Sequence, residues 1–169
     1  MLFDAPFQLG PFAVDHDGRL ALATPDSLPR FHIEWRGCRV EAVLRGDIGD
    51  GGAPAGDRGE LSLHAIVGRV PSTARIGSDN ATAQRGSVFE ALRALPAALP
   101  AGWRADLLAD HRVALQCASK IDMPMTVDAL LTDVTLFLLA LGPYLELLAE
   151  LGVEAPAAGA PGMVKTCPG

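Results

Sequence analysis

Apolar and polar residues alternate with a period of two along three stretches of the chain, which is typical of half-buried β-strands. These stretches, residues 11–23, 30–46 and 103–121, are each interrupted by a short polar or glycine-containing turn. Each one is therefore predicted to form an antiparallel hairpin. The positions expected to face the core are Phe12, Val14, Leu20, Leu22, Phe31, Ile33, Trp35, Val40, Ala42, Leu44, Val113, Leu115 and Cys117.

One more strand and a middle helix are predicted between the second and third hairpins. Residues 60–70 alternate in the same way and should place four apolar side chains on one face. Ser87 and Glu90 have the spacing of a helix capping box. The apolar residues after Ser87 fit a helix that Pro96 ends, because proline cannot continue the backbone hydrogen bonding. The stripe of this helix is Val88, Phe89, Leu92 and Leu95.

A long apolar helix is predicted over residues 126–151, with Thr126 as its N-cap and Gly152 after its end. Its central run, VTLFLLALGPYL, contains twelve residues between Asp133 and Glu146. A membrane span needs about 20 consecutive apolar residues, so we expect no membrane insertion.

A helical wheel divides the apolar residues of this helix into two groups. The core stripe is expected to contain Val127, Leu130, Leu131, Val134, Phe137, Leu138, Leu141, Leu145 and Leu148. A second flank contains Leu136, Ala140, Tyr144, Leu147 and Leu151. Together they form an apolar arc roughly 220° wide, whereas a one-sided surface helix needs about 100°. The second flank is covered either by another part of this chain or by a second protein.

The predicted order is five strands, a helix, two strands and a final helix. Consecutive hairpins favour an α+β fold in which the helices cover one face of an antiparallel sheet. We expect a single domain over residues 1–154 and a disordered tail over residues 155–169, which are rich in alanine, glycine and proline. Residues 46–59 are expected to form a flexible loop.

Composition excludes several classes of protein. The chain has 169 residues and a formal net charge of −6, so the phosphate backbone of nucleic acids would be repelled. Cys38 and Cys117 lie in apolar strand patterns and should be buried thiols, while Cys167 lies in the tail. The N-terminal residues lack the basic and apolar regions of a secretory signal, and a cytoplasmic location is expected.

Candidate chemistry is sparse. His16 and His111 fall in predicted turns beside aspartates, where solvated side chains are the rule. His32 and His64 could approach each other if their strands pair, but two imidazoles do not define a zinc site. The chain contains no recognisable catalytic, phosphate-binding or calcium-binding motif. We therefore expect no enzymatic activity, no metal and no cofactor.

The C-terminal half resembles a known group of bacterial proteins. The hairpin WRADLLADHRVALQCASKI leads through DMPMT into VDALLTDVTLFLLALGPYLELLAELG. This order, after a three-stranded section and a middle helix, is similar to type III secretion chaperones and to the YbjN-like bacterial regulators. The likeness covers residues 31–151. The chaperones begin with a helix, whereas residues 1–30 here are predicted to form a hairpin and a loop.

The resemblance implies a homodimeric, non-enzymatic module that binds a segment of a partner protein, such as a secreted effector. A YbjN-like regulatory domain and a small-ligand binder or enzyme without a motif are the alternatives. The wheel assigns Leu136, Tyr144, Leu147 and Leu151 to an intermolecular surface. The resemblance adds the middle helix, with Val88, Phe89 and Leu92, as the competing site for dimerisation.

Overall fold

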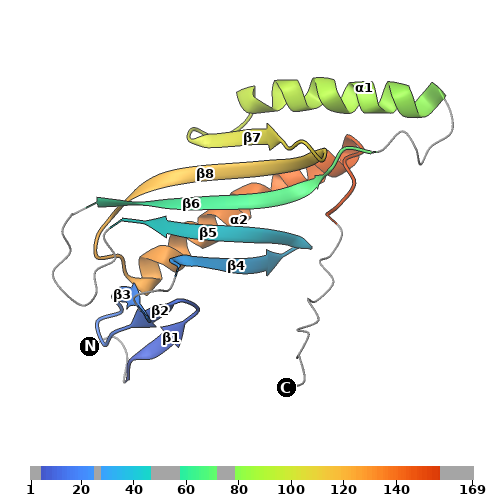
Figure 1. The fold of residues 1–169 in the computed structure, drawn as a ribbon. Coiled ribbons are helices and arrows are strands. Elements are labelled where there is room, and N and C mark those ends of the chain that lie inside the picture. Colours follow the sequence, from blue (N-terminus) through green and yellow to red (C-terminus); the bar gives the residue numbers. More distant parts are fainter. Residues whose placement is uncertain (1–4, 25–27, 47–57, 72–78, 157–169) are drawn as a thin grey trace, which may run out of the picture.

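The computed structural model describes residues 5–24, 28–46, 58–71 and 79–156, and the fold is α+β, as predicted (Figure 1). A three-stranded sheet contains β1 (Phe7–Leu9), β2 (Phe12–Val14) and β3 (Leu20–Leu22). A five-stranded sheet contains β4 (Arg30–Trp35), β5 (Cys38–Arg45), β6 (Arg58–Arg69), β7 (Trp103–Leu107) and β8 (Arg112–Asp122). The helices are α1 (Asp79–Ala94), the short 3-10 helix η2 (Leu95–Ala97) and α2 (Val127–Glu150).

The five-stranded sheet has the order β4-β5-β6-β8-β7, and every neighbouring pair is antiparallel. The β4–β5 hairpin pairs Trp35 with Cys38 across a two-residue turn. Both turn residues, Arg36 and Gly37, have positive φ angles of 48° and 76°. Such a turn matches the twist of the flanking strands, which explains why Arg36 and Gly37 can connect β4 directly to β5.

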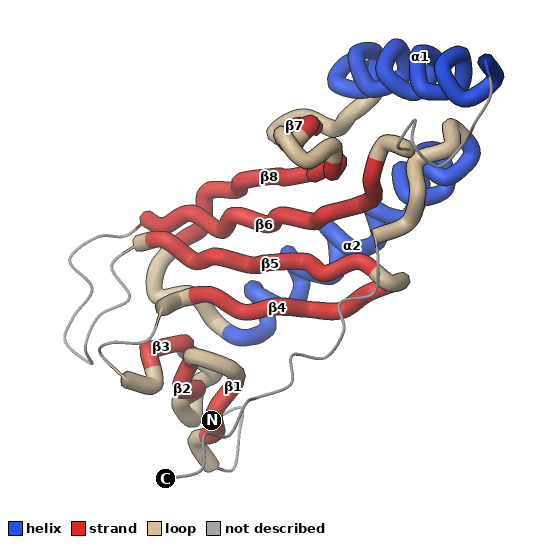
Figure 2. The backbone as a smooth tube through the Cα atoms, turned by 45° about the vertical axis from the view of Figure 1, so that its right-hand side comes forward, coloured by secondary structure: helices blue, strands red, loops and turns tan. Residues whose placement is uncertain are grey.

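Helix α2 covers one face of this sheet, and no other described helix or strand lies over the opposite face, called here the open face (Figures 1 and 2). The alternation along the strands decides which side chains go to which face. The covered face holds apolar residues, and the open face holds mostly polar ones. Buried residues on the covered face are Val40, Ala42, Leu44, Leu61, Leu63, Ala65, Val67, Val113 and Leu115.

Helix α2 begins where the sequence predicted. The Thr126 side chain accepts a hydrogen bond of 3.3 Å from the Ala129 backbone N–H, and Gly152 has a φ of 87° just beyond the end of the helix. Pro143 lies inside the helix but on an exposed position. The residues that α2 buries are Val127, Leu130, Val134, Phe137, Leu141, Gly142 and Leu148.

The small N-terminal sheet packs beside the end of the main sheet nearest β4 (Figures 1 and 2). Its β2–β3 hairpin was predicted, but β1 was not. Phe12 is fully buried, and its ring meets Phe31 of β4 edge-on with 6.1 Å between the centroids. The Leu20 N–H donates to the Met125 carbonyl at 2.9 Å, which ties β3 to the segment entering α2. This small sheet therefore helps close the core rather than standing apart from it.

Two expectations about the middle helix were wrong. Helix α1 begins at Asp79, so Ser87 lies in the middle of the helix and does not cap it. The first turns carry no apolar stripe, and the pattern therefore became visible only from Val88 onward. The helix also does not share the face that α2 covers, because it lies beyond the edge strand β7 (Figures 1 and 2).

The packed core continues just past α2. Val153 is buried, and its side chain occupies the space that a Cβ atom on Gly68 of β6 would need. Glu154 and Arg69 exchange two backbone hydrogen bonds of 2.8 and 2.9 Å. The predicted tail therefore starts after an ordered bridge, and most of it lies outside the described residues. The predicted loop over residues 46–59 also lies mainly outside them, except that its last two residues belong to β6.

Candidate functional site

The outward side of α2 carries four exposed leucines. The exposed fractions are 49% for Leu131, 58% for Leu136, 66% for Leu139 and 39% for Leu147. Pro143, which is also exposed, lies between the last two. We call these four leucines the outer leucine face. Burying one leucine side chain fully is worth about 1.5–3 kcal/mol, so this surface forgoes a large stabilisation while it faces water.

The outer leucine face agrees only in part with the surface that the helical wheel predicted, which included Leu136 and Leu147 but also Tyr144 and Leu151. Tyr144 is half-buried: its hydroxyl donates to the Ala98 carbonyl at 2.8 Å, and its ring lies 6.0 Å from that of Trp103. Leu151 is half-buried as well. The segment between η2 and β7 folds back onto α2 and covers Tyr144, which belongs to the predicted flank.

Two leucines were assigned differently by the wheel. Leu131 was predicted to belong to the core stripe, yet it is about half exposed. Leu139 was assigned to neither group and is the most exposed leucine of α2. Leu136 and Leu147 were correctly placed off the core stripe. By helix periodicity, Leu139 lies opposite the buried residues of α2, whereas Leu131 lies on one flank of the helix and Leu136 and Leu147 lie on the other.

The second predicted interaction region, on α1, forms one wall of a cleft. Val88 is fully buried and has no surface to offer a partner. Phe89 and Leu92 are half-buried. The cleft between α1 and the β7–β8 hairpin has a volume of about 340 Å³. Its lining consists of Phe89, Leu92, Arg93, Ala105, Asp106, Leu107 and Val113.

Acidic residues accompany the outer leucine face. The 24 residues of α2 include Asp128, Asp133, Glu146 and Glu150, and no basic residue. Glu146 accepts a hydrogen bond of 3.1 Å from Arg36, whose guanidinium also lies over the Trp35 ring. Both side chains of this ion pair are exposed to solvent. Asp128 and Glu150 have no ion pair among the described residues, so the helix carries uncompensated negative charge near both ends.

The two histidines singled out in the sequence both lie on the open face of the sheet but are not neighbours. Their strands do not pair directly, because β5 lies between them and places Glu41 opposite both His32 and His64. The imidazole Nε2 of His32 lies 3.6 Å from Glu41 Oε1, which also pairs with Arg30 at 3.1 Å. No group of three metal-ligating side chains is close enough to hold an ion in the part of the chain that the structure describes.

The two cysteines of the described region are free thiols on the covered side of the sheet. Cys38 is buried and Cys117 is half-buried. Burial raises the pKa of the Cys38 thiol, and the nearby Glu34 charge raises it further. Burial likewise raises the pKa of Cys117, with a contribution from Asp133. A raised pKa disfavours the thiolate, so neither site has the electrostatics of a reactive cysteine.

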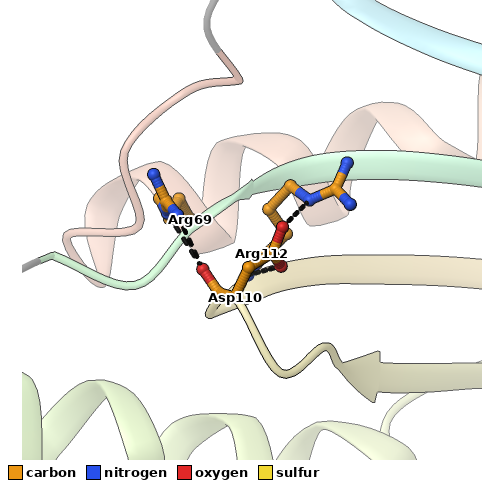
Figure 3. A network of polar contacts seen from close by, with 3 residues as sticks. All are labelled: Arg69, Asp110 and Arg112. Atoms are coloured by element: carbon orange, nitrogen blue, oxygen red, sulfur yellow. Dashed lines mark hydrogen bonds and ion pairs between the residues drawn. The ribbon is translucent and has the colours of Figure 1, made fainter.

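The Asp-His turns are structural. Asp110 closes the β7–β8 turn, where its carboxylate accepts hydrogen bonds from the Arg112 backbone and side chain, and its carbonyl accepts two from Arg69 (Figure 3). Desolvation acts against ionisation of Asp110, but these hydrogen bonds and the two arginine charges outweigh it and hold its pKa below the ordinary value. In the β2–β3 turn, Asp15 accepts from two backbone N–H groups in the same manner.

The length and apolar character of α2 also meet the requirements of a membrane-crossing helix, and among the described residues it is the one helix that does so. The side of α2 facing the sheet is packed into the core, and helices at the core of soluble proteins have the same composition. Comparison with models of protein families, with curated proteins and with solved structures finds no match for this chain.

Proposed function

We propose that this chain is a non-enzymatic protein-binding module that holds a segment of a partner protein, in the manner of the type III secretion chaperones it resembles. The observation that carries the proposal is the outer leucine face. Exposed apolar patches are typical of interaction sites, and α2 exposes four large apolar side chains on a single helix. The four leucines project from a helix whose opposite side is anchored in the core, so they form a preorganised surface.

The order of elements supports the same proposal. A three-stranded section, a middle helix, a hairpin and a final helix follow each other in the chain, as they do in the resembled group. The small sheet β1–β3 takes the N-terminal position where the chaperones have a helix. The homodimer expected from the sequence stays a prediction, and the exposed α2 surface and the α1 side are its two candidate interfaces.

The cleft beside α1 favours a second candidate function, the binding of a small molecule. Its volume of about 340 Å³ falls at the lower end of the range for ligand pockets. Its walls are mostly apolar, and Arg93 and Asp106 supply opposite charges. Leu107→Trp should fill the cleft and prevent the thermal stabilisation that a ligand bound there would produce.

The main proposal is tested by capture of partners from a native extract on three forms of the immobilised protein. These are the wild type, Leu136→Glu/Leu139→Glu, and Ser62→Glu/Gln116→Glu as a control on the open face of the sheet. A partner that binds the outer leucine face is retained by the wild type and the control, and is lost from the leucine variant. Identical sets of proteins on all three forms would contradict the proposal, provided that circular dichroism shows all three to be folded.

A further inference from the structure

We propose that the segment bound by the outer leucine face is a basic amphipathic helix of a partner protein. This inference rests on the proposed function and specifies the chemistry of the partner. It follows from three features of α2: the length of its exposed apolar surface, a hollow with an acidic edge, and the sign of its charges.

The length of the surface suits a helical partner. Leu131 and Leu147 are 16 residues apart, which corresponds to about 24 Å along a helix axis. At about 100° per residue, Leu131 and Leu147 lie on opposite flanks of the helix, with Leu136 and Leu139 between them. A partner helix of four to five turns, with apolar residues at spacings of three and four, would cover Leu136, Leu139 and Leu147, which lie within about 80° of one another, by ordinary ridges-into-grooves packing and would extend past the hollow beside Leu131.

The first half of α2 contains a shallow hollow of about 440 Å³. Leu131 and Leu136 supply its apolar lining, Thr132 and Thr135 supply hydroxyl groups, and Asp128 supplies a carboxylate. A lysine or arginine side chain fits this combination, because its aliphatic stem packs on apolar surface while its charged end reaches an acid. Neutral or acidic side chains would leave the carboxylate of Asp128 without a counter-ion.

The charges of α2 favour a basic partner over a second copy of the chain. The helix has four acidic residues and no basic residue. In a two-fold antiparallel pair, Asp128 of one copy would approach Glu146 and Glu150 of the other, and a parallel pair would align identical acids. Like charges juxtaposed in an interface oppose association. Opposite charges on a different protein would instead steer it to this surface.

The same charges disfavour a lipid surface. Helices that lie on membranes carry lysine and arginine beside their apolar face and are attracted to anionic headgroups. The exposed side of α2 has the opposite charge. A protein segment with interspersed basic residues is therefore the better match for this combination of leucines and carboxylates.

The test uses two synthetic, fluorescein-labelled helical peptides of 18 residues. Both have leucine at spacings of three and four; one has lysine and the other glutamate at the flanking positions. Fluorescence anisotropy measures their affinity for the full-length protein at low and at moderate salt. We expect the lysine peptide to bind about tenfold more tightly or better at low salt, with a preference that salt reduces.

Two matched charge-reversal variants distinguish the contribution of charge to peptide affinity from that of the apolar surface. Glu150→Lys reverses one charge beside the outer leucine face, and Glu90→Lys makes the same change on the exposed side of α1. We expect the first to weaken the lysine peptide about three- to tenfold and the second to leave its affinity unchanged. Leu139→Glu should abolish binding of both peptides, and Leu139→Ser provides a milder version should the glutamate disturb folding.

Equal binding of both peptides, lost in the Leu139 variants, would overturn the charge inference and leave the proposed function standing. Binding of neither peptide would overturn both. A wild-type dimer that Leu139→Glu dissociates would identify a second copy as the occupant and overturn the inference. Leu139-dependent binding to phosphatidylcholine vesicles would overturn it in favour of a membrane.

Discussion

The open face of the five-stranded sheet and the exposed side of α2 differ in how many large apolar side chains they present to solvent. The open face of the five-stranded sheet displays arginine, histidine, glutamate, serine and glutamine, many of them paired across neighbouring strands. The exposed side of α2 displays four leucines and a proline among two threonines and three acidic residues. The open face of the sheet is thus mostly polar, as expected for a surface in water, whereas the final helix exposes several large apolar side chains.

This contrast teaches that the leucines of α2 are not explained by folding alone. The sheet needs only one side of α2 as a cover, and that side is already fully apolar. Solubility favours polar residues on the outward side, as on the open face of the sheet. Apolar residues there are therefore best explained by a second macromolecule that covers them.

The largest expected difference in stability is between substitutions on the inner side and on the outer side of α2. Leu141→Ala, at a fully buried position, should lower the free energy of unfolding by about 2–5 kcal/mol. Leu139→Ala should change it by less than about 0.5 kcal/mol, because this side chain has little contact to lose. Urea unfolding followed by circular dichroism measures both. Similar losses for the two variants would mean that the outward side is covered in the isolated protein.

Truncations at the C-terminal end of the packed core should have a smaller effect on the melting temperature. Truncation after Glu154 keeps its two hydrogen bonds to Arg69, so the melting temperature should shift by less than about 4 °C. Truncation after Gly152 also removes buried Val153 and should lower it by clearly more. Thermal unfolding of the two truncated proteins gives the comparison. A drop well above about 4 °C after truncation at Glu154 would show that residues 155–169 stabilise the fold.

Tyr144 and Leu147 offer a finer comparison, because they are three residues apart on α2. Tyr144→Phe removes the 2.8 Å hydrogen bond to Ala98 and should destabilise the protein by about 0.5–1.5 kcal/mol. Leu147→Ala should have a smaller effect, since this leucine is more exposed. Chemical denaturation distinguishes them. A negligible effect of Tyr144→Phe would place the tyrosine on the free surface, as the sequence suggested.

Labelling of the cysteines tests whether the covered face of the sheet is buried and requires no substitution in the protein. A thiol reagent at neutral pH should label Cys167 quickly, and Cys38 and Cys117 only upon unfolding. Burial shields both thiols and raises the pKa of each, which reduces the reactive thiolate fraction. Mass spectrometry of labelled peptides gives the rates. Fast labelling of Cys38 in the native protein would contradict its inward orientation and would reopen a redox role.

The sequence predicted the main sheet well, because burial on one face imposes a period of two on every strand. Strand β1 was missed because three residues are too few to carry such a pattern. The start of α1 was missed because residues 79–86 show no apolar stripe in the sequence. A capping-box spacing at Ser87 then suggested a boundary in the wrong place.

The candidate surface was predicted only in part. A helical wheel gives the angle of each residue around the helix, but it does not show which neighbour covers that angle. Tyr144 is covered by Ala98, a residue 46 positions earlier in the chain, and this contact depends on how the segment after α1 returns to the sheet. Leu139 was overlooked because the acidic residues nearby made its side of the helix appear polar.

The most direct test of the outer leucine face as a binding surface is methyl NMR of the protein with ¹³C-labelled leucine methyl groups. The lysine-containing helical peptide is titrated into the full-length protein, and the shifts of individual leucines are followed. We expect the largest changes at Leu131, Leu136, Leu139 and Leu147, and little change at Leu92 and Leu107 beside α1. Changes confined to Leu92 and Leu107 would contradict the account, because the peptide would then occupy the cleft between α1 and β7.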